Sequence, residues 1–232
     1  MLAQDLVSFV LANLPSAPAR VLEVGAGQGE LARLLTSAGY DVVAIDPSAE
    51  NADVLPIPLA EIEAPAASFD AAVAVVSLHH VDPLGTSCAR LAEVLRPRAA
   101  LVVDEFDVDR FDERAAGWWI EQRRALGFAE ARSARELIAD MRAEVHPLSR
   151  MQVALKDHFD LEGPRRGSYL YRWGLDEALR ASEEELIAAG ALPPVGARLI
   201  GRCVDRPART RAGTSKDAAS APDHRERGPG GP

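Results

Sequence analysis

Residues 21–46 read VLEVGAGQGELARLLTSAGYDVVAID, and this stretch decides the fold. Its first part, from Val21 to Val24, has the apolar, β-branched composition of a buried parallel strand. Three glycines follow, and apolar residues then recur at helical spacing from Leu31 to Ala38. A second apolar run leads to Asp46. The pattern predicts a βαβ unit, and therefore a parallel sheet with helices on its faces.

The spacing within this unit also predicts a nucleoside site. A glycine turn before a helix N-terminus lets backbone N–H groups approach a ligand, and an acidic residue about 20 positions later can accept hydrogen bonds from ribose hydroxyls. Asp46 stands at that distance. The dinucleotide fingerprint needs a glycine at position 30, where the chain has Glu30, a negative charge beside the pyrophosphate position. A nucleoside ligand without phosphates therefore fits better than NAD or FAD.

With Glu23 two residues before the first glycine, the segment EVGAGQG resembles the first motif of class I S-adenosylmethionine-dependent methyltransferases. The resemblance extends from about Val21 to Asp104, and a weaker similarity follows near the C-terminus. It implies S-adenosylmethionine as cofactor. The cofactor-binding positions that it implies are Glu23, Gly25, Ala26, Gly27, Gly29, Asp46, Pro47, Ala60, Glu61, Ser77 and Leu78.

The adenine end of this expected site departs from the family pattern. Relatives often carry an acidic residue after the third strand that binds the adenine amino group, and Leu59 stands at the matching position. Glu61, two residues later, either supplies that carboxylate or is a solvated residue that opens a helix. Both interpretations of Glu61 stay open at the level of sequence.

Candidate catalytic residues follow two apolar runs. The run from Ala71 to Val76 is typical of a central strand, and Ser77, Leu78, His79 and His80 come at its carboxyl end, where ligands bind in open α/β sheets. Imidazole titrates near neutral pH, so His79 and His80 are candidates for a proton-transfer role. The alternative is that one packs on the cofactor and the other faces solvent. Asp104 and Glu105, after the next strand, are candidates to orient an acceptor hydroxyl or amine, and the alternative is that they are strand-end charges facing solvent.

The resemblance implies a Rossmann-like, doubly wound, mostly parallel sheet of seven strands whose last strand is antiparallel. The proline-containing run from Leu55 to Leu59 is the expected third strand, at an edge. We expect a methyltransferase domain over residues 1–205, with a helical cap inserted over 106–158, and a disordered tail over 206–232, which is poor in apolar residues. Four aromatic residues are either core or acceptor-pocket residues, with core the commoner outcome: Trp118, Trp119, Tyr169 and Trp173.

Composition narrows the expected partners. The net charge of −9, with a basic C-terminal stretch, leaves the remainder too acidic to bind a nucleic-acid backbone. No apolar run is long enough for a membrane span, and the N-terminus lacks the charge pattern of a secretory signal. The two cysteines, Cys88 and Cys203, form no metal-ligand pattern, so we expect no metal and a cytoplasmic location. Monomer and homodimer are equally open.

The sequence thus predicts an enzyme that transfers a methyl group from S-adenosylmethionine to O, N or C of a small-molecule acceptor. Nucleic-acid acceptors are disfavoured, since the N/D-P-P-Y/F segment of amide and nucleobase methyltransferases is absent after the strand ending at Val76. A non-catalytic module that binds S-adenosylmethionine or S-adenosylhomocysteine and acts through a protein partner is the alternative. An NAD-dependent oxidoreductase is a third hypothesis, which Glu30 opposes.

Overall fold

A computed structural model describes residues 2–205 of the chain. Its centre is one six-stranded sheet with the strand order β2-β1-β3-β4-β6-β5. The first four strands are parallel, and β6 runs antiparallel to both β4 and β5. The strands are β1 (Arg20–Val24), β2 (Asp41–Ile45), β3 (Phe69–Val75), β4 (Leu95–Phe106), β5 (Phe159–Gly167) and β6 (Gly196–Cys203).

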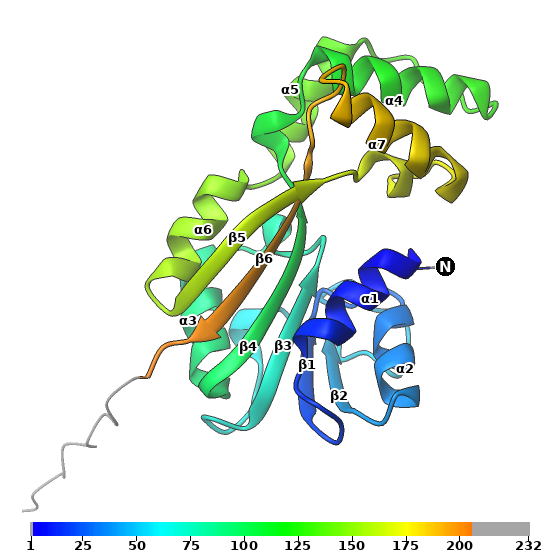
Figure 1. Ribbon diagram of the computed structural model, residues 1–232. Helices are drawn as coiled ribbons and strands as arrows, with labels where there is room; N and C mark the ends of the chain where they lie inside the picture. Colours follow the sequence, from blue (N-terminus) through cyan, green and yellow to red (C-terminus); the bar gives the residue numbers. More distant parts are fainter. Residues whose placement is uncertain (1, 206–232) are drawn as a thin grey trace, which may run out of the picture.

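Helices cover both faces of the sheet (Figure 1). Successive side chains of a strand point to opposite faces, so Leu22 packs with α3 and α6, whereas Val21 packs with α1 and α2. The helices are α1 (Gln4–Asn13), α2 (Glu30–Ser37), α3 (Leu84–Val94), α4 (Glu113–Ala125), α5 (Ala134–Glu144), α6 (Leu148–Lys156) and α7 (Arg180–Ala188). Short 3₁₀ turns are η1 (Leu59–Glu61), η2 (Leu78–His80), η3 (Val108–Arg110), η4 (Leu170–Arg172) and η5 (Glu177–Leu179). The predicted Rossmann-like class, with an antiparallel last strand, is confirmed.

The predicted count of seven strands is wrong, because residues 55–59 form no strand. Leu55 makes a single parallel bridge with Ile45, and its N–H donates to the Ala44 carbonyl at 2.9 Å. Pro56 and Pro58 have no N–H to donate, so pairing cannot continue. The segment instead turns into η1, and β2 remains the edge strand of the sheet.

The expected cap region, 106–158, is mainly helical, but its helices pack in two separate parts of the structure. Helices α4 and α5 pack on each other around Phe111, Trp119 and Leu137, beyond the carboxyl end of β4 (Figure 1). Helix α6 instead packs on the sheet beside α3 through Leu148, Met151 and Leu155. The boundaries of the cap and of the domain stay predictions, and the expected disordered tail, 206–232, lies outside the described residues.

The four aromatic residues that were candidates for a pocket form part of an apolar cluster with the cap. Trp119 and Trp173 stack with ring centroids 4.5 Å apart, and the Trp119 Nε1–H donates to the Trp173 carbonyl at 2.8 Å. Tyr169 is buried beside Phe106 and Trp118 packs at the cluster's margin. These side chains hold α4, α5 and η4 together, as the commoner core interpretation predicts. No helix within residues 2–205 is long and apolar enough to cross a membrane.

Candidate active site

A cavity of about 560 Å³ opens at the carboxyl ends of β1, β2 and β3. Its volume falls in the range of small-molecule sites. Five predicted cofactor residues (Gly25, Gly27, Asp46, Pro47 and Ser77) and the candidate base His80 line it. The remaining lining residues are Val24, Gln28, Ile45, Ser48, Ile57, Pro58, Leu59, Val76, Val81, Asp82 and Ser87. The structure thus gathers in one cavity residues that the sequence separates by more than 50 positions.

The glycine turn has the geometry that a close backbone approach requires. Gly25 has φ +69°, and a Cβ placed on it would lie 2.2 Å from the Ser77 Cβ, so only glycine fits between β1 and β3 here. Gly27 has φ +52°, and a Cβ there would meet nothing within 4 Å, which leaves open space in front of its backbone. Gly29 precedes α2 in the left-handed region. Ala26 and Gly29 belong to the turn but do not line the cavity.

Asp46 follows β2 and contacts this turn directly. Its Oδ2 accepts the Gly27 N–H at 2.9 Å, and its Oδ1 accepts the Ser48 N–H at 2.8 Å. The carboxylate therefore fixes both the glycine turn and the loop after β2, and it remains on the cavity wall. A carboxylate in this position can accept bonds from ribose hydroxyls, as its spacing from the glycines predicts.

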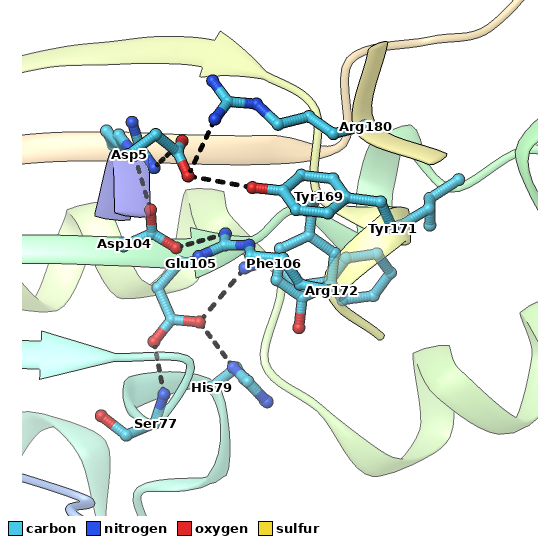
Figure 2. A network of polar contacts seen from close by, with 12 residues as sticks. Asp5, Ser77, His79, Asp104, Glu105, Phe106, Tyr169, Tyr171, Arg172 and Arg180 are labelled. Carbon is cyan, nitrogen blue, oxygen red and sulfur yellow. Dashed lines mark hydrogen bonds and ion pairs between the residues drawn. The ribbon is translucent and has the colours of Figure 1, made fainter. Parts of the chain in front are cut away.

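Glu105, near the end of β4, holds the turn that follows β3 (Figure 2). Its buried carboxylate accepts the N–H groups of Ser77 at 3.0 Å and Leu78 at 2.7 Å, and its Oε2 lies 2.5 Å from the His79 Nδ1. Ser77 Oγ in turn donates to the Val24 carbonyl at 2.8 Å. Leu78 does not line the cavity and contributes through its backbone. Glu105 is therefore neither a solvent-facing charge nor a cavity-lining residue, and the sequence gives no sign that it holds this turn.

The two histidines occupy different environments. His79 is buried and bound to Glu105, and its carbonyl accepts the His146 N–H at 2.8 Å. His80 is exposed, lines the cavity and lies against His79, with ring centroids 4.2 Å apart. Desolvation, followed by the neighbouring His79, lowers the pKa of His80 below its ordinary value. Of the pair, His80 is the imidazole that reaches the cavity, and its lowered pKa favours the neutral form.

The structure does not bring Asp104 to the cavity. Neighbouring residues of a strand point to opposite faces, so its carboxylate lies on the side of β4 away from that of Glu105 (Figure 2). Asp104 is buried between two arginines, with Oδ1 2.6 Å from an Arg172 nitrogen and Oδ2 2.7 Å from the Arg198 Nε. Both oxygens are therefore engaged in ion pairs, and Asp104 is not retained as a catalytic candidate.

The adenine end also differs from the expectation. Ala60 and Glu61 do not line the cavity; Glu61 is exposed and borders a separate hollow beside β2. In the structure, Glu61 is therefore a solvent-exposed residue, as the second of the two interpretations predicts. Leu59, Ile57 and Pro58 form an apolar wall at this end, and Asp82 and Ser87 are the polar residues near it that the sequence did not point to.

Glu23 lies behind the glycine turn rather than in the cavity. Burial raises the pKa of its carboxyl to about 8, partly offset by the backbone of Ala32 and by Arg33. Its Oε2 is buried without a hydrogen-bond partner among the described residues. The carboxyl is thus protonated in the ligand-free protein at neutral pH, although it would be ionised in the unfolded chain.

This shift predicts how stability depends on pH. Between pH 4.5 and about 8 the folded state holds a proton that the unfolded state releases, so the free energy of unfolding should fall as the pH rises through this window. The slope from this residue is at most about 1.4 kcal/mol per pH unit. Urea denaturation at pH 5 and at pH 8 measures this fall in the free energy of unfolding. The fall should be smaller in Glu23→Gln than in wild type. An equal loss in the variant would contradict the assignment.

The residues present fit S-adenosylmethionine. The open space before Gly27 admits a ligand against the backbone, Asp46 offers carboxylate oxygens to a ribose, and the apolar wall of Ile57, Pro58 and Leu59 suits a purine face. The buried Ser87 Oγ makes no hydrogen bond with any described residue and so has capacity for a ligand. No feature suggests a pyrophosphate, because Glu30 opens α2.

Comparison with known proteins agrees with this site. A methyltransferase domain model matches residues 2–143. Uncharacterized methyltransferases of Mycobacterium tuberculosis and Mycobacterium bovis are 40% identical over 98 residues, 38% of this chain and 40% of each relative. A ubiquinone biosynthesis O-methyltransferase of Rhodopseudomonas palustris is 33% identical over 98 residues, 36% of this chain and 38% of that protein. These matches span less than half of each curated relative.

Solved structures share the fold at low identity. A Burkholderia thailandensis 1,6-didemethyltoxoflavin N1-methyltransferase with bound S-adenosylhomocysteine has a TM-score of 0.51 at 18% identity, covering 87% of this chain and 76% of that one. The [4+2]-cyclase SpnF has a TM-score of 0.57 at 17% identity, covering 87% and 81%. The chain belongs to the methyltransferase domain family, a family of enzymes that use S-adenosylmethionine as methyl donor. The predicted family and cofactor are confirmed.

Proposed function

We propose that the protein transfers a methyl group from S-adenosylmethionine to O, N or C of a small-molecule acceptor that enters beside His80. The observation that carries this is the cavity itself, which joins the glycine turn, Asp46 and His80 at the carboxyl edge of the sheet. Two proteins similar to this chain are named as methyltransferases of small molecules. When bound, S-adenosylmethionine supplies an activated methyl group.

The chain's own residues would then position the reactants. Gly27 and Asp46 would hold the nucleoside, and Glu105 fixes the Ser77–His79 turn beside them. Fixing the acceptor in line with the donor and excluding water supply most of the rate in such displacements. An acceptor that must lose a proton needs a base, and His80 lines the cavity with a lowered pKa that favours its neutral, proton-accepting form.

The role of His80 predicts a specific defect. His80→Ala should lower kcat by about tenfold to a hundredfold for an acceptor that loses a proton, with little change in affinity for S-adenosylhomocysteine. The wild-type rate should fall as the pH drops through the lowered pKa of His80, below 6.5, and the variant should lack this limb. His158→Ala, outside the cavity, is the matched control. An unchanged pH–rate profile in His80→Ala would exclude a proton-transfer role.

The alternative, a non-catalytic binding module that acts through a partner protein, draws on one observation. None of the cavity-lining residues comes from the cap region 106–158, so the structure shows no wall that the cap builds for an acceptor. A screen of metabolite extracts with isotopically labelled methyl donor, followed by mass spectrometry, separates the two functions. Labelled product supports the enzyme. Donor binding without any product across extracts, together with capture of a stable partner, supports the module.

A further inference from the structure

Ser87 is a buried polar residue that the proposed mechanism does not use. It lies in the first half of α3, its side chain is 1% exposed, and it lines the cofactor cavity. Its Oγ is fully buried and has no hydrogen-bond partner among the described residues. Buried hydroxyls are nearly always hydrogen-bonded, since leaving one unpaired costs about 1–3 kcal/mol. A cavity wall is where a ligand can supply the missing partner.

The position of Ser87 within the cavity indicates which part of the ligand it meets. Helix α3 packs against η1, and Ser87 lines the cavity together with Leu59, Ile57 and Pro58. Asp46, which suits the ribose, follows directly after β2 and lines the same cavity. The adenine ring extends beyond the ribose, so its amino edge should face α3.

We propose, resting on the proposed function, that the Ser87 Oγ accepts a hydrogen bond from the exocyclic amino group of the cofactor's adenine. The expected acidic residue is absent here, because Leu59 occupies its position and Glu61 points to solvent outside the cavity. A hydroxyl oxygen has two lone pairs and can take over the role of acceptor. Ser87 therefore determines the preference for adenine over purines that lack the amino group.

Asp82 is the competing acceptor, because it also lines the cavity. It is exposed, however, so water satisfies its carboxylate and it gains little from a neutral amino group. Ser87 is excluded from solvent and has no such substitute. If Ser87 is the acceptor, Ser87→Ala should lose the preference for adenine. If Asp82 is the acceptor, Asp82→Asn should lose it.

The test uses calorimetry on the full chain with two ligands, 5′-methylthioadenosine and its analogue with unsubstituted purine in place of adenine. Wild type should bind the adenine ligand about fivefold to tenfold more tightly, the effect of one hydrogen bond. Ser87→Ala should bind both ligands equally, at the affinity that wild type has for the purine. Asp82→Asn should keep the wild-type preference.

Ser68→Ala is the matched control, since its Oγ is likewise buried without a partner but lies outside the cavity. It should bind both ligands as wild type does. The melting temperature of ligand-free Ser87→Ala should be unchanged or higher, because alanine favours the helix and removes an unpaired hydroxyl. A Ser87→Ala protein that retains the preference, or an Asp82→Asn protein that loses it, overturns the inference. Failure of wild type to bind S-adenosylhomocysteine overturns the proposed function instead.

Discussion

Replacing Asp46 by alanine should weaken binding of S-adenosylhomocysteine about 1,000-fold. Each hydrogen bond to a charged carboxylate contributes about 1.5–3 kcal/mol, and a ribose can engage both oxygens. The substitution also removes the acceptor that holds the Gly27 N–H at 2.9 Å, so the glycine turn loses its fixed position. Calorimetric titration of the variant measures the effect directly.

The matched control for Asp46 is Asp41, at the opposite end of the same strand. Asp41 is exposed, its carboxylate lies 3.3 Å from the Arg20 Nε, and it does not line the cavity. Asp41→Ala should leave the affinity within twofold of wild type. If Asp46→Ala bound S-adenosylhomocysteine as tightly as Asp41→Ala, the carboxylate would not hold the ribose.

Replacing Glu105 by alanine should destabilise the fold more than any other single change at the site. The substitution leaves the Ser77 and Leu78 N–H groups buried without acceptors and removes the partner of the His79 ring. Unpaired buried donors cost about 1–3 kcal/mol each, so the free energy of unfolding should fall by about 3 kcal/mol or more. Urea denaturation monitored by tryptophan fluorescence and circular dichroism gives this value.

Two further variants make this result specific. Glu105→Gln keeps the shape of the side chain and one acceptor oxygen. Its free energy of unfolding should therefore fall by less than that of Glu105→Ala. Glu162→Ala on β5 removes an exposed carboxylate of the same sheet and should change stability by no more than about 0.5 kcal/mol. Equal stability of Glu105→Ala and Glu162→Ala would mean that Glu105 does not organise the Ser77–His79 turn.

The sequence already indicates which residues of the proposed cofactor half lie together, because that half is local. Val21 to Asp46 form one βαβ unit, and neighbouring parallel strands bring the glycine turn and Asp46 together by geometry alone. The carboxyl end of β3 joins them for the same reason, so Ser77 and His80 line the same cavity. Positions fixed by strand order and register can be inferred from the pattern of apolar runs.

The remaining residues depend on side-chain direction and on contacts distant in sequence. Asp104 and Glu105 are adjacent, yet Asp104 faces Arg172 and Arg198 whereas Glu105 faces His79. A shift of one residue in the predicted strand register would exchange the faces to which the two side chains point. Ser87 appears as one polar residue in an ordinary helix until η1 is seen beside it. The missing edge strand follows from Pro56 and Pro58, a signal that the sequence does contain.

We propose that the cavity binds the S-adenosyl nucleoside rather than a dinucleotide. Thermal unfolding of the full chain, with S-adenosylhomocysteine and NAD in parallel, distinguishes the two ligands. At 100 times its dissociation constant, a ligand that binds the folded state stabilises that state by about 2.7 kcal/mol. We expect a saturable rise in melting temperature with S-adenosylhomocysteine and none with NAD. A rise with NAD alone, or with neither ligand, would contradict it.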